Sequence, residues 1–232
     1  MVSIEWMRRA AASQFLAGLL ATLTVIAACG SPASPSNAAP LTSTEQFAAT
    51  IWPFEKDAVG SVPAGATSFS GRWAVRAEPG TPSPPNALCQ TATAEFPALQ
   101  LSADVHRDMA ITAQVKPISG SEDRAAGLLL RIQDANNYYI VRANALEGSV
   151  VIFKYVNGTR SEIKSGSATV ISGAWQQLRA EVSGTTLRGV LDGRLIVEAT
   201  DTAFREGRAG LWTKADSTTC FDDVTVGPLA NP

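Results

Sequence analysis

The sequence predicts an all-β protein, a single-domain antiparallel two-sheet sandwich of the jelly-roll type. Short runs that alternate apolar and polar residues recur between residues 71 and 226, with turn signals between them. Such runs are typical of strands that bury one face. Asn157-Gly158 is a strong two-residue hairpin signal, because both central positions of that turn need a positive φ. Beyond the N-terminal segment, no stretch shows a sustained apolar stripe with the 3.6-residue period of a helix.

The first 28 residues have the pattern of a signal peptide. Arg8 and Arg9 precede an apolar run over residues 10–26, and the sequence Ile26-Ala27-Ala28-Cys29 resembles the lipobox of bacterial lipoproteins. That resemblance implies that Cys29 receives a diacylglycerol and becomes the first residue of the mature protein. An ordinary cleaved signal peptide that happens to precede a cysteine is the alternative.

Three further segments follow from composition. Residues 29–44 are rich in proline, serine and alanine and carry no charge, so we expect a flexible linker between lipid and domain. The folded domain is expected over residues 45–228, an ordinary size for one core, and residues 229–232 form a short tail. This organisation predicts an extracytoplasmic protein that is lipid-anchored to the membrane or envelope of a bacterial cell.

Within the domain, the alternating runs predict about a dozen strands. They are expected at residues 71–75, 87–92, 98–101, 109–117, 128–133, 138–144, 150–156, 159–164, 175–182, 186–191 and 194–199, with two more between 207 and 226. In the run 128–133 we expect Leu128, Leu130 and Ile132 on one face, because side chains alternate along a strand. The other face of this central pair of strands is expected to carry Arg131, Arg142 and Asn144 outward.

The cysteines predict one disulfide. If Cys29 carries the lipid, Cys89 and Cys220 remain as an even pair in an oxidising compartment. Two buried free thiols are the alternative. A zinc site is not expected, because the chain has one histidine and no CxxC spacing.

Five runs in the second half of the chain occur in a characteristic order. They are GLLLRIQDANNYYIVRAN, a hairpin with KYVNG, AWQQLRAEVSGTTLRGVLDGRL, GRAGLWTKADS and FDDVTV. This order, over residues 69–226, resembles the concanavalin A-like lectin/glucanase superfamily, in particular laminin-G-like modules grouped with the 3-keto-disaccharide hydrolase domain of bacteria. The resemblance implies that the first and last strands lie side by side, which would bring Cys89 near Cys220. Function does not follow, because this fold carries lectins, glycosidases and adhesive modules.

The sequence assigns no catalytic residue. The glucanases of this superfamily carry their carboxylates on one strand in an E-x-D-x-x-E pattern, which is absent here. Glu147, Glu162 and Glu181 have no acidic partner two positions away. His106 is the single histidine and lies in the polar turn SADVHRD without a nucleophile beside it.

We predict no cofactor, with calcium as the alternative. Many members of the superfamily bind one Ca²⁺ through carboxylates and carbonyls at a sheet edge, and Asp216, Asp222 and Asp223 are weak candidates for such a site. Asp134, Asn136 and Asn137 are further oxygen donors in a loop. Asp and Asn are also standard turn residues, so a purely structural role is the competing interpretation.

Strand parity predicts a polar sheet face that carries aromatic rings. Rings stack on the apolar faces of sugars while polar groups hold the hydroxyls. The candidate ligand-binding residues are Arg131, Tyr138, Arg142, Asn144, Lys154, Arg179, Glu181, Trp212 and Lys214. Most are basic, which favours an anionic polymer, and a plain solvated face is the alternative. Trp212 could equally belong to the core, because a bulge would change its parity.

Taken together, the sequence predicts a monomeric cell-envelope lipoprotein that binds carbohydrate or an anionic envelope polymer without catalysis. A nucleic-acid partner is not expected, because the formal charge is −2. One alternative is a glycoside hydrolase or lyase of the 3-keto-disaccharide hydrolase type. The other is an adhesive or scaffolding module that binds a protein partner.

Overall fold

The computed structural model describes residues 47–229, and all the secondary-structure elements among these residues are β-strands. The predicted all-β class is therefore confirmed. Within these residues no helix is long and apolar enough to cross a membrane. The predicted signal peptide, Cys29, the linker and residues 230–232 of the tail lie outside the described residues.

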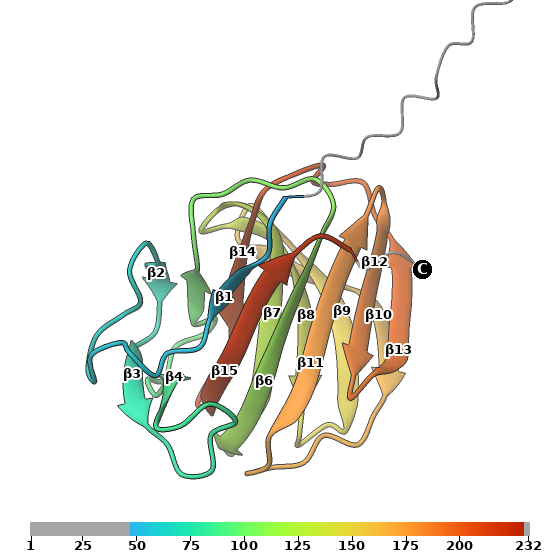
Figure 1. Ribbon diagram of the computed structural model, residues 1–232. Coiled ribbons are helices and arrows are strands. Elements are labelled where there is room, and N and C mark those ends of the chain that lie inside the picture. Colours follow the sequence, from blue (N-terminus) through green and yellow to red (C-terminus); the bar gives the residue numbers. More distant parts are fainter. Residues whose placement is uncertain (1–46, 230–232) are drawn as a thin grey trace, which may run out of the picture. The chain divides into compact units, whose positions relative to one another are not determined.

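The described residues form fifteen strands in two antiparallel sheets, which Figure 1 shows as two layers. The strands are β1 (Thr50–Trp52), β2 (Thr67–Ser70), β3 (Trp73–Ala77), β4 (Asn86–Gln90), β5 (Ala98–Gln100), β6 (Met109–Ser119), β7 (Ala125–Asp134), β8 (Asn137–Asn144), β9 (Ser149–Val156), β10 (Thr159–Ser167), β11 (Gln176–Ser183), β12 (Thr186–Leu191), β13 (Arg194–Thr200), β14 (Arg208–Trp212) and β15 (Thr218–Gly227). The eight-stranded sheet has the order β13-β12-β11-β6-β15-β4-β3, with β1 paired to β15. The seven-stranded sheet has the order β10-β9-β8-β7-β14-β5-β2.

The main core lies between the two sheets. Alternate residues of each strand enter it, for example Ile111 and Leu178 from the eight-stranded sheet and Leu128 and Val141 from the seven-stranded sheet. The predicted strands all form. The sequence missed β1 and β2, because three or four residues are too few to show an alternating pattern.

The predicted disulfide is confirmed. Cys89 on β4 and Cys220 on β15 are direct partners in the ladder, and their sulfurs are bonded. The bond lies on the outer face of the eight-stranded sheet, meaning the face turned away from the other sheet, where Ala87, Ile118 and Trp175 pack around it.

A β-bulge at Arg131 divides β7 into two halves with different parity. Arg131 has a φ of 53°, and the pairing of β7 with β8 shifts between Leu130 and Asp134. Leu128 and Leu130 enter the core between the sheets, as predicted. Ile132 instead joins the cluster on the outer face of the seven-stranded sheet, so its predicted parity is wrong. The extra residue of a bulge reverses the alternation that follows it.

Two carboxylates fasten the proline-rich loop 78–85 to β15. The backbone N–H of Ser83 donates to Asp222 Oδ2 at 2.9 Å, and its hydroxyl donates to Asp223 Oδ1 at 2.6 Å. The N–H of Asp223 donates to Asp222 Oδ1 at 2.9 Å. The Asp222 side chain is fully buried, and this burial raises its pKa to about 6 despite these hydrogen bonds.

We expect Asp222 to make the protein less stable at neutral pH than at mildly acidic pH. Because the pKa of Asp222 is raised in the folded state, protonation of this carboxyl stabilises the fold. The stabilisation is complete below the ordinary pKa of 3.8 and is lost as the pH rises above about 6. The free energy of unfolding should therefore fall by about 3 kcal/mol from below to above this window through Asp222 alone. Urea unfolding between about pH 4 and pH 7 measures the slope.

The matched protein for this measurement is Asp222→Asn, which cannot titrate. Asp201 and Asp216, whose pKa values are lowered, act in the opposite direction but do so equally in both proteins. The difference between the two pH profiles therefore isolates Asp222. Parallel profiles would show that the buried carboxyl titrates at its ordinary pKa.

Candidate functional site

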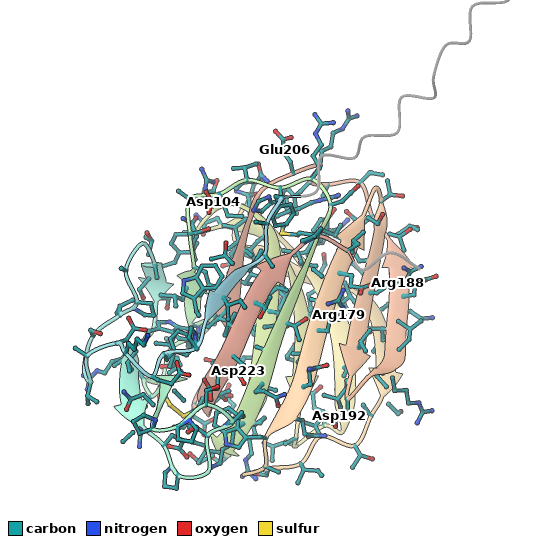
Figure 2. The ribbon with its side chains drawn as sticks, viewed as in Figure 1. Asp104, Arg179, Arg188, Asp192, Glu206 and Asp223 are labelled. Carbon is teal, nitrogen blue, oxygen red and sulfur yellow. A yellow bond between two sulfur atoms is a disulfide. The ribbon has the colours of Figure 1, made fainter. Side chains whose placement is uncertain are left out.

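The structure places the nine predicted ligand-binding residues in three separate regions. Tyr138, Arg142, Asn144, Trp212 and Lys214 belong to the outer face of the seven-stranded sheet and its rim. Arg131 and Lys154 lie at one end of the sandwich, and Arg179 and Glu181 lie on the outer face of the eight-stranded sheet, where Figure 2 labels Arg179. The prediction of one shared face is therefore wrong for these last four residues.

Each of these four residues departs from the prediction for a physical reason. The bulge turns Arg131 away from the outer face of its sheet. Lys154 has the parity of Val150 and Ile152, which enter the core, and it extends past the core edge to Asp201 at 2.8 Å. Arg179 and Glu181 do point outward, but from β11, which belongs to the other sheet. Strand parity alone does not say to which sheet a strand belongs.

The outer face of the seven-stranded sheet carries a second apolar cluster, here called the outer cluster. Its buried members are Ala98, Ala125, Leu129, Ile132, Tyr138, Ile140, Val151, Phe153 and Trp212, with Phe69, Phe96 and Tyr155 packed against them. Trp212 lies over Gly127, where an added Cβ would be 2.9 Å from the indole Cε3. The glycine thus lets the indole rest on the backbone of β7.

Aromatic rings dominate the surface of the outer cluster. Phe96 stacks on Trp212 with ring centroids 5.8 Å apart, and it meets Tyr155 edge-on at 5.5 Å. Tyr155 also packs on Tyr138 at 4.9 Å. Burial raises the pKa of the Tyr138 hydroxyl well above its ordinary value, so this tyrosine stays neutral.

Four of the predicted residues on this face are buried rather than open to solvent. Tyr138, Arg142, Asn144 and Trp212 are each at most 2% exposed. Arg142 pairs with Glu147, and its guanidinium lies 5.1 Å from the Phe153 ring centroid. These side chains therefore build the floor of the face. Strand parity predicts that a side chain points away from the main core. It does not predict that neighbouring side chains on the outer face then bury it.

Arg160, which is not among the predicted residues, extends from the edge strand β10 over the rings of the outer face. Its guanidinium carbon lies 4.6 Å from the Phe153 centroid, 4.9 Å from Phe96 and 5.8 Å from Trp212. This arrangement has the geometry of cation–π stacking. Its Nη1 is buried and has no hydrogen-bond partner among residues 47–229. Burial lowers the pKa of the Arg160 guanidinium below its usual value.

The hairpin signal Asn157-Gly158 was enough to predict one neighbour of Arg160. A two-residue turn at these positions pairs Tyr155 with Arg160, and the structure shows that register. Arg160 therefore shares a face with Tyr155. The sequence did not indicate that Phe96, from a distant loop, would meet the same guanidinium.

An open pocket of about 390 Å³ lies beside Arg160 on this outer face. We call it the face pocket. It is lined by Thr93, Ala94, Glu95, Phe96, Glu122, Arg160, Lys214 and Ala215. Two cations can donate hydrogen bonds there and two carboxylates can accept them, around one aromatic ring.

The rim of the face pocket is held by two carboxylates that are themselves fully engaged. Asp216 accepts the backbone N–H of Ser121 at 2.6 Å, of Glu122 at 3.1 Å and of Asp123 at 2.9 Å. These bonds hold the pKa of Asp216 well below its usual range, and they fix Glu122 at the pocket. The buried Asp123 accepts from Asn144 and from Lys214. Lys214 is thereby tied to the rim.

The three calcium candidates do not gather at one point. Asp216 contacts the turn 121–123, whereas Asp222 and Asp223 contact Ser83 in the loop between β3 and β4. Among residues 47–229, the one group of three potential metal-ligating side chains is Glu78 with Cys89 and Cys220, and both cysteines are consumed by the disulfide. The expectation of no cofactor, with calcium as the alternative, stays a prediction.

Comparison with known proteins shows similarity to several bacterial proteins. No protein-family model matches the chain. A levanase of Bacillus subtilis strain 168 is 33% identical over 112 residues, which are 47% of this chain and 16% of the levanase. The chain therefore matches about a sixth of that relative.

Solved structures give the same picture at the level of the fold. The carbohydrate-binding module CBM66 from Bacillus subtilis superposes with a TM-score of 0.62 at 26% identity, covering 70% of this chain and 95% of the module. A galectin-like protein from Bacillus subtilis gives 0.59 at 10% identity over 81% and 99% of the two chains, and a Bacillus licheniformis β-glucanase gives 0.54 at 10% over 79% and 99%. The predicted jelly-roll sandwich is thus shared with carbohydrate-binding, galectin-like and glucanase proteins.

Proposed function

We propose that this protein binds carbohydrate in the face pocket, with levan as the first ligand to test. The observation that carries the proposal is Arg160, whose guanidinium lies against three aromatic rings and which lines an open pocket. A guanidinium held in place in this way offers N–H donors to the oxygens of a ligand without further ordering of its side chain.

The lining of the face pocket suits a polyhydroxylated ligand. Phe96, which is partly exposed and lines the pocket, offers an apolar surface to the C–H groups of a sugar ring. Lys214 and Arg160 would donate to hydroxyl oxygens, while Glu95 and Glu122 would accept hydroxyl hydrogens. This mixture of ring, donors and acceptors is typical of sites that bury one or two sugar units.

The comparisons support the same proposal. The 26% identity to the module CBM66 extends over nearly the whole of that module, and the name of the matching levanase suggests the polymer. Binding without catalysis fits a module of this kind. The predicted signal peptide and Cys29 extend the proposal to a lipid-anchored protein of the cell envelope. Metabolic labelling with a fatty acid tests the anchor, and the label should be lost in Cys29→Ser. A monomeric state stays a prediction.

We expect Arg160→Ala to weaken levan binding by about tenfold or more, because it removes the donor and uncovers the three rings. Isothermal titration calorimetry with levan measures the affinity, and dextran serves as a polysaccharide of different linkage. Arg160→Lys should bind levan little better than Arg160→Ala, because an ammonium group lacks the planar guanidinium that stacks on rings. Arg188→Ala, on the outer face of the eight-stranded sheet, is the matched control (Figure 2).

Unchanged affinity in Arg160→Ala would exclude the face pocket as the levan site. Chromatography of the same mixtures separates binding from hydrolysis. A binding module leaves the polymer intact, whereas release of sugars that is lost in Glu95→Gln or Glu122→Gln would favour the glycoside hydrolase alternative.

A further inference from the structure

A second cavity lies at one end of the sandwich, where the loops 102–108 and 201–207 meet the turn between β11 and β12. Its volume is about 470 Å³, and we call it the end pocket. Asp104 and Glu206, labelled in Figure 2, belong to these two loops and mark that end of the molecule. The end pocket shares no lining residue with the face pocket.

Arg131 gives the end pocket a rigid, positively charged wall. Its guanidinium donates to the carbonyl of Arg107 through Nε at 2.9 Å and Nη2 at 2.6 Å, and to the carbonyl of Phe204 through Nη1 at 2.8 Å. It thereby joins the two loops, although only 2% of it is exposed. Nη2 makes a further contact with Asp108 at 3.4 Å, so four of the five N–H groups of Arg131 have protein partners.

The two carboxylates of the end pocket are already neutralised by protein groups. Asp201 accepts from Lys154 at 2.8 Å, from the Tyr139 hydroxyl at 2.7 Å and from the N–H of Ala203 at 2.8 Å. Burial acts to raise the pKa of Asp201, but these bonds lower it below its usual value, so the carboxylate is ionised and paired. Asp108 accepts from Gly184 at 2.7 Å and from Arg131.

The arginines of the end pocket have N–H donors that these carboxylates do not use. Arg205 is exposed and makes no ion pair within the part of the chain that the structure describes. The side chain of Arg107 is 82% exposed, and its partner Glu206 is 51% exposed, so their ion pair contributes little and can open. Phe204, which packs edge-on against Tyr139 at 5.0 Å, adds a half-buried ring to the lining.

We propose that the end pocket is a second binding site, which takes a sugar unit that carries a carboxylate. Arg205 and Arg107 would grip the carboxylate, since guanidinium groups bind carboxylates through paired N–H donors. Arg131, which lines the same cavity, would add a third positive charge, and the Phe204 ring would support the sugar. This site is independent of the levan proposal, because it differs in location and in the charge of its ligand.

Calorimetric titration with D-galacturonate tests this site, and the methyl ester of galacturonate is the matched neutral probe. We expect the acid to bind at low ionic strength with a dissociation constant on the order of 1 mM, and the ester to give no detectable heat. Raising NaCl to about 200 mM should weaken the binding severalfold, because the arginines are partly exposed.

Arg205→Ala should weaken galacturonate binding at least fivefold and leave levan binding unchanged. This arginine is exposed and holds no loop, so the variant retains the fold. Arg194→Ala, an exposed arginine on β13, is the control for loss of one positive charge. Equal heats for the acid and the ester, or full binding in Arg205→Ala, would overturn the proposal. Loss of galacturonate binding in Arg160→Ala would also overturn it while leaving the face pocket intact as a sugar site.

Discussion

Replacing both Cys89 and Cys220 by alanine is expected to lower the free energy of unfolding by about 4–5 kcal/mol. The bond closes a loop with a sequence separation of 131 residues, and in the chain-entropy model such a cross-link removes much of the freedom of the unfolded chain. It also fastens the end of the eight-stranded sheet, where β3 is the last strand. Among the described strands, the β3–β4 hairpin is paired to the rest of its sheet only through Leu88, Cys89 and Gln90 of β4.

Urea unfolding of the double variant and of the parent protein measures this loss. Reduction of the parent with dithiothreitol should lower its stability by the same amount, which separates the effect of the bond from that of the two side chains. Hydrogen exchange should rise first in β3 and β4. A double variant as stable as the parent would show that native pairing already fixes β4 on β15 without the bond.

Trp212→Ala is expected to cost about 3–5 kcal/mol, because the indole is fully buried in the outer cluster and its loss leaves a cavity. The variant also removes one of the three rings under Arg160. We therefore expect levan affinity to fall together with stability. Trp212→Phe keeps a ring over Gly127 and should retain most of both.

Far-ultraviolet circular dichroism during urea unfolding measures the stability of these variants without relying on the altered tryptophan. Calorimetry with levan at low temperature, where Trp212→Ala is still folded, measures the affinity. Trp52→Ala, on β1 of the other sheet, is the control for removal of a tryptophan elsewhere. If Trp212→Ala binds levan as tightly as the parent, the rings of the outer cluster do not support the ligand site.

Most of the fold could be predicted from the sequence because its signals are local. Alternation marked the long strands, and the Asn157-Gly158 turn set the register that places Arg160 beside Tyr155. The disulfide followed from counting cysteines, and the superfamily resemblance placed its strands together. Strands β1 and β2 were not predicted, because a strand of three or four residues has too few positions to show the two-residue alternation.

The candidate site could be predicted only in part. Parity correctly sent Tyr138, Arg142 and Asn144 out of the main core, and it left Trp212 undecided. It could not show that the rings of the outer cluster bury these side chains again. Arg160 and Phe96 come from separate segments, and no local pattern links them.

Residue spacing and composition were thus enough to predict the two-layer β architecture, the hairpins and the cysteine pair. They could not predict which sheet and which face each polar side chain would reach. A single bulge redirects Arg131, and membership of the other sheet separates Arg179 from Arg142. A binding surface is assembled from long-range contacts, whereas alternation along a strand reports only on the strand itself.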